Sequence, residues 1–133
     1  MDTCVLSELV KPRPSPHVSE WFDLAPPGAL YVSVLTFGEI RKGIEKLPDS
    51  RRRARIVAWL ETELPAWFED RVLSIDSSVA DEWGRLMAQP GNIPAIDGLI
   101  AATALRHRLA VVTRNEADFA ATGVELLNPW KEG

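Results

Sequence analysis

The stretch LAVVTRNEADF, residues 109 to 119, decides which class of fold this sequence adopts. Its first part, LAVVTRN (109–115), is rich in apolar and β-branched side chains and predicts a strand buried on both faces. The polar segment EADFAATG (116–123) follows at once and predicts a short helix. A buried strand that leads directly into a helix is typical of an α/β domain, in which helices cover both faces of a mostly parallel sheet.

The same alternation of strand and helix continues along the rest of the chain. Further strands are expected at LYVSVLT (30–36), RVLSID (71–76) and VELLNPW (124–130). Helices are expected at 17–24, 37–47, 79–89 and 94–105, with another that leads through IVAWLETELPAWF (56–68) and is interrupted at Pro65. Asp49 or Ser50, and Asp76 or Ser77, are the expected helix caps. This order predicts a three-layer α/β/α sandwich with a central, mostly parallel sheet, formed by a single domain at 1–133.

Composition excludes several classes of protein. The 133 residues are 46% hydrophobic and 26% charged, which is ordinary for a soluble globular domain, and Cys4 alone can form no internal disulfide. No apolar run approaches the roughly 20 residues that span a bilayer, and no export signal is evident, so we expect a cytoplasmic protein without a membrane partner. The net charge of -4 gives no bulk attraction to nucleic acid, and the basic residues between Arg41 and Arg55 are interpreted as a solvated helix face.

Four carboxylates stand out because of where they lie. Asp2 and Asp118 are near strand ends, Glu39 follows the strand at 30–36, and Asp97 lies in the otherwise small and apolar run PAIDGLIAATAL (94–105). Each also has a simple structural explanation, since a carboxylate in the first turn of a helix answers the helix dipole. Asp76, another acid at a strand end, is most simply a helix cap.

Taken together, these acids point to a cation. Ligand sites in parallel sheets lie at the carboxyl ends of the strands, and carboxylates that meet there cannot all ionise without a positive charge. Hard oxygen ligands suit Mg²⁺ or Mn²⁺, and such a site performs metal-assisted phosphodiester hydrolysis. From the residues alone, the prediction depends on the sheet bringing these strand ends together.

Five stretches of the chain resemble the PIN-domain family, and in particular the ribonuclease toxins of bacterial toxin–antitoxin pairs, the VapC and FitB kind. They are DTCVLSEL near the start, SVLTFGEIRKGI (33–44), IPAIDGLIAATAL (93–105), VVTRNEADF (111–119) and LLNPW at the end. The resemblance covers nearly the whole chain, and all five stretches occur in the order that the family has.

This resemblance implies a role for each candidate site residue. The family's acids fall on Asp2, Glu39, Asp97 and Asp118, which would hold one or two Mg²⁺ or Mn²⁺ ions that activate water against an RNA phosphate. Thr113 and Asn115 would orient a carboxylate or a water molecule. Arg41 and Arg114 either contact the RNA backbone or have a surface or structural role. The resemblance also implies a homodimer and a cognate antitoxin with a segment lying across the acidic groove.

Two departures from the family pattern concern the first aspartate. The family has several apolar residues before it, forming a central strand, whereas only Met1 precedes Asp2 here. Either TCVL (3–6) and its neighbours form that strand, or the true start lies upstream. The family commonly has asparagine two residues after the aspartate, where this chain has Cys4. Replacing the amide by a thiol is expected to remove one hydrogen-bond anchor and to make Cys4 a small buried hydrophobe.

The leading hypothesis is therefore a metal-dependent endoribonuclease toxin that is neutralised by an antitoxin. The alternative is a catalytically weakened PIN-like protein that acts mainly as an antitoxin-binding partner. A phosphoacceptor module with a receptive Asp76 is disfavoured because Lys131 comes too late in the sequence. A phosphatase with a nucleophilic Asp2 would need a second aspartate where Cys4 stands. The five tryptophans are interpreted mostly as core residues.

Overall fold

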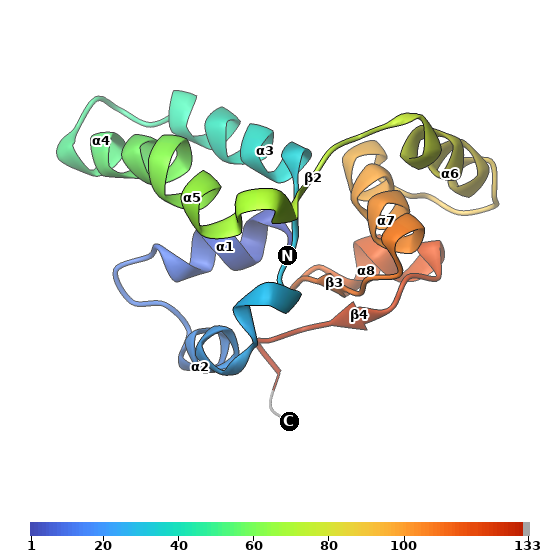
Figure 1. Ribbon diagram of the computed structural model, residues 1–133, viewed down its shortest axis with the longest axis horizontal. Coiled ribbons are helices and arrows are strands. Elements are labelled where there is room, and N and C mark those ends of the chain that lie inside the picture. Colours follow the sequence, from blue (N-terminus) through green and yellow to red (C-terminus); the bar gives the residue numbers. More distant parts are fainter. Residues whose placement is uncertain (132–133) are drawn as a thin grey trace.

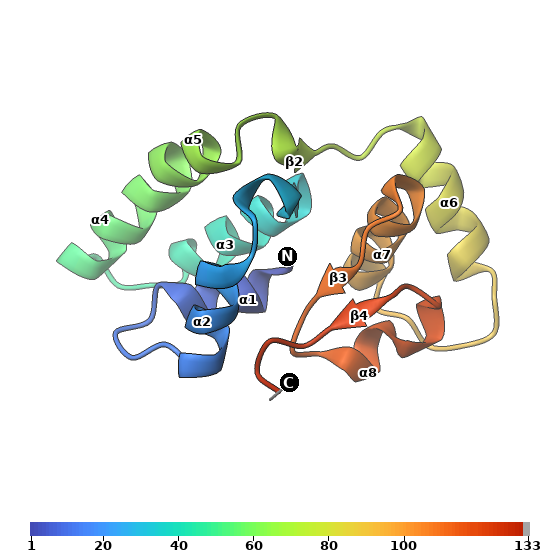
Figure 2. The same ribbon diagram turned by 60° about the horizontal axis from the view of Figure 1, so that its bottom comes forward.

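The computed structural model describes residues 1–131 as two halves that meet beside the N-terminal residue (Figures 1 and 2). The first half contains α1 (Thr3–Leu9), α2 (Pro16–Leu24), β1 (Val32–Ser33), α3 (Val34–Glu45), α4 (Arg51–Ala58), α5 (Leu64–Phe68) and β2 (Val72–Leu73). The second half contains α6 (Ser77–Met87), α7 (Ala95–His107), β3 (Val111–Val112), α8 (Glu116–Phe119) and β4 (Leu126–Leu127). Strands and helices thus alternate in the predicted order.

The strands pair in parallel, as predicted, but they form two separate two-stranded sheets. Strand β1 pairs with β2 in the first half, and β3 pairs with β4 in the second. The start of the chain bridges the two pairs, because the Met1 nitrogen donates to the Tyr31 carbonyl oxygen at 2.8 Å and the Asp2 N–H donates to that of Val112 at 3.1 Å. Asp2 is thereby fixed between the two halves.

The strands are much shorter than the apolar runs that predicted them. The run at 30–36 yields only Val32–Ser33 as strand, and α3 begins at Val34, three residues before the predicted helix. The reason is local, since the Ser33 hydroxyl accepts the Leu35 N–H at 3.1 Å and caps the helix there. Apolar character predicted burial at this point but not the residue where extended chain gives way to helix.

The interpretation of TCVL as a strand is wrong, because Thr3–Leu9 is helix α1. Asp2 is its N-cap, and the Asp2 carboxylate accepts the N–H groups of Cys4 and Val5. These N–H groups at the start of a helix have no partner within the helix, so a preceding aspartate favours helix over strand.

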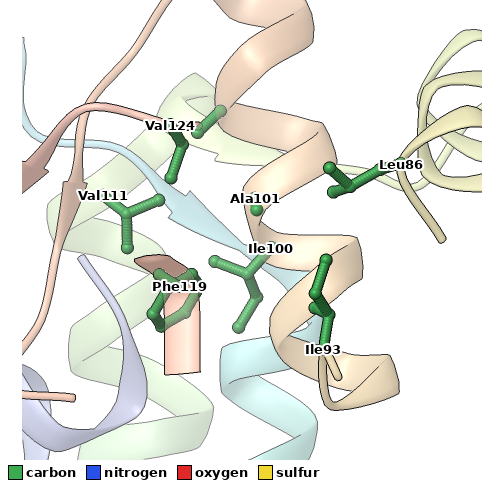
Figure 3. Close-up of a cluster of buried hydrophobic side chains, with 8 residues drawn as sticks. Leu86, Ile93, Ile100, Ala101, Val111, Phe119 and Val124 are labelled. Carbon is green, nitrogen blue, oxygen red and sulfur yellow. The ribbon is translucent and has the colours of Figure 1, made fainter. Parts of the chain in front are cut away.

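Each half has its own hydrophobic core. The second half packs α7 against β3, α6 and α8 through side chains that include Ile100, Val111, Leu86 and Phe119 (Figure 3). A cluster around Ile40, Ile44, Leu64 and Phe68 fills the first half. A small third cluster of Val5, Val18 and Val112 joins the two halves, because Val5 and Val18 lie on α1 and α2 and Val112 lies on β3.

Several local predictions are confirmed. Ser50 caps α4 and Asp76 caps α6, each through a hydrogen bond from a backbone N–H to the side chain. Pro65 interrupts its helix as expected: the chain forms a π-helix at Trp59–Glu63, and α5 begins immediately afterwards. In the part of the chain that the structure describes, no helix is long and apolar enough to cross a membrane.

Candidate active site

The four carboxylates singled out in the sequence come from four different helices. Asp2 caps α1, Asp97 lies in the first turn of α7, and Asp118 lies on α8. Glu39 is in the middle of α3 rather than in its first turn, so the interpretation of Glu39 as a simple answer to the helix dipole is wrong. Helices α1 and α3 belong to one half and α7 and α8 to the other, so the four acids lie on helices from both halves (Figure 1).

Asp97 lies within electrostatic range of the other three acids. Burial is the largest of the causes that raise the pKa of the Asp97 carboxyl to about 6, and the negative charges of Asp118, Glu39 and Asp2 contribute to the same rise, in that order. No cation contributes to this shift. The structure therefore brings together the acids whose meeting the sequence could state only as a condition.

Hydrogen bonds hold the Asp2 carboxylate on both sides. Oδ1 accepts the Cys4 N–H at 3.1 Å and the Cys4 thiol at 2.7 Å, while Oδ2 accepts the hydroxyl of Thr113. Asp2 is only 6% exposed, so these bonds offset the loss of water that burial imposes on the carboxylate. They also fix the direction in which the carboxylate points.

The thiol of Cys4 supplies a hydrogen-bond anchor, contrary to the expectation that this anchor is lost. Its Sγ donates to Asp2 Oδ1 and accepts the backbone N–H of Arg114 at 3.3 Å. The pKa of the Cys4 thiol is raised to about 11, chiefly by burial and then by the charge of Asp2 and the hydrogen bond to Asp2. Cys4 also packs against the third hydrophobic cluster, so it combines apolar packing with a polar contact.

Two threonines support the carboxylates. Thr113, the side chain that donates to Asp2, was expected in this role, is fully buried, and itself accepts the backbone N–H of Asn115 at 3.0 Å. Thr3 was missed: its hydroxyl donates to Glu39 Oε1 at 2.7 Å. Thr3 and Glu39 are 36 positions apart, so the sequence gives no signal for this contact except that Thr3 lies next to Asp2. The side chain of Asn115 is exposed and makes no cap hydrogen bond to α8, and the predicted orienting role of Asn115 stays a prediction.

The two arginines proposed for RNA binding have other partners. Arg41 forms an ion pair with Glu61 of the π-helix at 2.7 Å. The guanidinium of Arg114 lies over the ring of Trp130, 5.4 Å from the ring centre, although its backbone N–H reaches the site through Cys4. Among residues 1–131, none of the described ion pairs involves Asp2, Glu39, Asp97 or Asp118.

Charge and donor chemistry of this cluster suit a hard divalent cation. All four side chains offer carboxylate oxygens, and among residues 1–131 no described ion pair with a lysine or arginine offsets their negative charge. As the side chains stand, however, no three His, Cys, Asp or Glu residues within 1–131 are close enough to hold one ion together. The arrangement therefore fits an ion of the Mg²⁺ type, which is bound through one or two carboxylates and keeps several waters.

Comparison with known proteins gives consistent results. The family model described as PIN domain matches residues 1–125. The chain is 37% identical to VapC ribonuclease Y4jK of Sinorhizobium fredii over 98% of this chain and 96% of that protein. It is 33% identical to Toxin FitB of Neisseria gonorrhoeae over 99% of this chain and 98% of that protein. The crystal structure of FitAcB from Neisseria gonorrhoeae superposes with a TM-score of 0.92 at 34% identity, covering 97% of this chain and 96% of that chain.

Proposed function

The chain belongs to the PIN-domain family, and from this premise we propose that it is a divalent-metal-dependent endoribonuclease, the toxin of a toxin–antitoxin pair. Relatives named as a VapC ribonuclease and as Toxin FitB match almost the whole chain, which supports both the reaction and the biological role. The predicted α/β fold of the PIN type is confirmed by the structural match. The predicted homodimer and cytoplasmic location are part of this proposal.

The observation that carries the proposal is the uncompensated charge at Asp97. Its pKa is raised to about 6, first by burial and then by Asp118, Glu39 and Asp2, so the metal-free site opposes its own ionisation. Mg²⁺ or Mn²⁺ at such a site supplies positive charge for a phosphate oxygen and lowers the pKa of bound water. A carboxylate that costs free energy in the empty site has a clear use if it binds a cation.

The chain's own residues have distinct tasks in this proposal. Asp97 and Asp2 bind the cation from opposite halves, and Thr113 and Cys4 hold the Asp2 carboxylate in place. Glu39, oriented by Thr3, and the exposed Asp118 complete the negative site.

A cleavage assay with the purified chain tests the proposal. Labelled RNA is incubated with Mn²⁺, with Mg²⁺ or with a chelator, using the wild type, Asp97→Asn and the matched control Asp81→Asn, whose acid lies on α6 and pairs with Arg85. We expect internal cleavage only with a divalent ion, loss of cleavage in Asp97→Asn, and no loss in Asp81→Asn. Cleavage that persists in the chelator or in Asp97→Asn would contradict the proposal and assign the activity to another site.

The same variants distinguish the alternative role. If the folded wild type binds its antitoxin but cuts no RNA with either ion, the chain is a catalytically weakened member that acts through binding. Growth of bacteria that express the chain, with or without the gene encoded beside it, gives an independent measurement. Arrest that Asp97→Asn relieves, and that the neighbouring gene also relieves, supports an active toxin with an antitoxin.

We place antitoxin docking along a groove between α1 and the α4–α5 segment, here called the tryptophan groove. Two adjoining hollows of about 420 and 280 Å³ form it, and they share Val10, Trp59 and Glu63. Arg52 and Arg55 line one end, and aromatic side chains that include Phe22 and Trp67 line the other. An apolar floor with charges at its rim is typical of a groove that binds an amphipathic segment.

Charge indicates the chemistry of that segment. Arg52 and Arg55 are exposed, and neither takes part in the ion pairs described among residues 1–131. The groove therefore favours an antitoxin segment with apolar side chains next to acidic ones. Its position also suits inhibition, because Val10 directly follows α1 while Asp2 caps the other end, about 12 Å away at 1.5 Å per residue.

Charge reversal tests this docking surface. The double variant Arg52→Glu with Arg55→Glu should bind the antitoxin about tenfold more weakly or worse, since like charges then face each other. The control Arg106→Glu reverses an exposed charge at the end of α7, outside the groove. Calorimetric titration with the antitoxin measures both. Equal affinity of the double variant and the wild type would exclude this groove as the docking surface.

A further inference from the structure

We propose that Cys4 is a positioning residue of the site: its thiol orients the Asp2 carboxylate for cation binding and ties α1 to the segment that follows β3. This inference rests on the proposed function, because cation binding is the task for which Asp2 is held. It assigns to a thiol the hydrogen-bonding work that a side-chain amide performs when asparagine occupies this position.

Geometry gives the first argument. Cys4 lies in the first turn of α1, two residues after the Asp2 cap, and its Sγ is 2.7 Å from Asp2 Oδ1. The two backbone N–H groups that share this oxygen lie further away, at 3.1 and 3.4 Å. The thiol is thus the nearest donor to Oδ1, while Thr113 binds the other oxygen. Together, the two side chains define the plane of the carboxylate.

The second argument is that the thiol also reaches across the molecule. Sγ accepts the Arg114 N–H at 3.3 Å and lies 3.7 Å from the Thr113 hydroxyl, both more than 100 positions away in the sequence. Thr113 and Arg114 follow directly on β3. Loss of the thiol therefore removes a donor to Asp2 and an acceptor for Arg114 at one step, which loosens the joint between α1 and the second half.

The thiol is suited to this task because it is a neutral hydrogen-bond donor. Its Sγ lies 2.7 Å from Asp2 Oδ1. A neutral donor orients the carboxylate without neutralising it. A lysine or arginine in the same place would instead supply the positive charge that the site leaves to a cation.

Four substitutions separate positioning from packing. Cys4→Ser and Cys4→Asn keep a side-chain donor, whereas Cys4→Ala and Cys4→Val have none, and valine retains most of the volume. Ser7→Ala, on the same helix but outside the described contacts of Asp2, is the matched control. Thermal unfolding of each metal-free variant shows which of them keep the wild-type fold.

Mn²⁺ affinity by calorimetric titration is the decisive measurement, and RNA cleavage is the second. Groups that orient metal ligands typically change metal affinity about 10- to 100-fold when they are removed. We expect a loss of this size in Cys4→Ala and Cys4→Val, recovery in Cys4→Asn or Cys4→Ser, and no change in Ser7→Ala. In cleavage, saturating Mn²⁺ should restore much of the kcat of Cys4→Val with little change in the KM for RNA.

The outcomes separate this inference from the proposed function. Wild-type Mn²⁺ affinity in Cys4→Val would overturn the positioning role, even if the wild type cleaves RNA. A loss of affinity that neither donor variant restores would overturn it as well, since volume and apolar packing would then explain the effect. If the wild type binds Mn²⁺ in a Cys4-dependent way but cuts no RNA, the nuclease proposal fails and the positioning role stands. A wild type that binds no Mn²⁺ overturns both.

Discussion

The two ends of helix α1 carry two acids that are buried to the same degree, but the protein stabilises their carboxylate charges in different ways. Asp2 at the amino end and Glu8 in the last turn are each 6% exposed. Glu8 forms an ion pair with Lys11 at 2.8 Å and accepts the Ser15 N–H at 2.8 Å. Asp2 has only neutral donors and faces a cluster of other carboxylates.

The consequence is visible in how Glu8 and the acids near Asp2 titrate. The hydrogen bond from Lys11 lowers the pKa of Glu8, and the Ser15 N–H lowers it further. In the acidic cluster around Asp2, burial and then the charges of Asp118, Glu39 and Asp2 raise the pKa of Asp97, which lies on α7, to about 6. A buried acid is therefore no sign of a functional site by itself. The informative feature is a group of neighbouring acids that form no ion pair with a lysine or arginine among residues 1–131.

The largest effect is expected from removing the charge of Asp97, which belongs to the uncompensated acidic cluster beside Asp2. Asp97→Asn should weaken Mn²⁺ binding by more than about 100-fold, beyond the range typical of a group that only orients a ligand. Glu8→Gln should leave Mn²⁺ affinity within about twofold of the wild type, because its charge is already paired. Calorimetric titration of both variants checks the pair of expectations. An equal loss of Mn²⁺ affinity in Asp97→Asn and Glu8→Gln would contradict a difference in function between the acidic cluster and the paired Glu8.

A pH series sharpens the comparison. Since the pKa of Asp97 is raised to about 6 by burial and by Asp118, Glu39 and Asp2, protons compete with the cation below that pH. Mn²⁺ affinity should fall about tenfold for each pH unit below 6 and level off above 7. Titrations between pH 5 and pH 8 measure this slope. An affinity that does not change between pH 5 and pH 7 would show that Asp97 stays ionised without the metal.

At the compensated end, a change should affect stability rather than binding. Glu8→Gln breaks the ion pair with Lys11 and weakens the bond from Ser15, which should cost about 1–2 kcal/mol in the free energy of unfolding at pH 7. Because the folded pKa of Glu8 is lowered, this stabilisation is present above the ordinary pKa of glutamate and is lost as the pH falls through the folded value. Urea unfolding at pH 7 and pH 3 should show the wild type and the variant converging in acid.

The smallest effect has the opposite sign. The pKa of Asp97 is raised in the folded state, so ionisation destabilises the metal-free fold as the pH rises between about 4 and 6. In a chelator at pH 7, Asp97→Asn should therefore unfold at a higher temperature than the wild type. The gain in the free energy of unfolding should be about 1 kcal/mol or less, because the side chain is partly exposed and water screens its charge. At pH 3 this difference should vanish. A less stable variant at pH 7 would mean that the Asp97 carboxylate already has a favourable partner.

Much of the fold follows from patterns that are local in the sequence. Strands and helices alternate as predicted, and Ser50, Asp76 and Pro65 act where their chemistry places them, because a cap or a proline works within a few residues of itself. The lengths of the strands were not predictable in this way. Apolar residues mark burial in a helix as well as in a strand, so the run at 30–36 could not show that α3 begins at Val34.

By itself, the sequence determined which acids to consider for the candidate site: Asp97 stands out because it lies in a nearly apolar helix, and the family resemblance adds Asp2, Glu39 and Asp118. Only the tertiary structure decided how these acids are held. Thr3 donates to Glu39, Thr113 donates to Asp2, and Cys4 accepts the Arg114 N–H, and each of these contacts joins residues too far apart in the sequence for a periodic pattern to predict. Only the contact from Cys4 to Asp2, the cap of the same helix, is local. Hydrogen bonds of this kind depend on which distant segments of the chain pack together, and that is fixed by packing rather than by neighbours in the sequence.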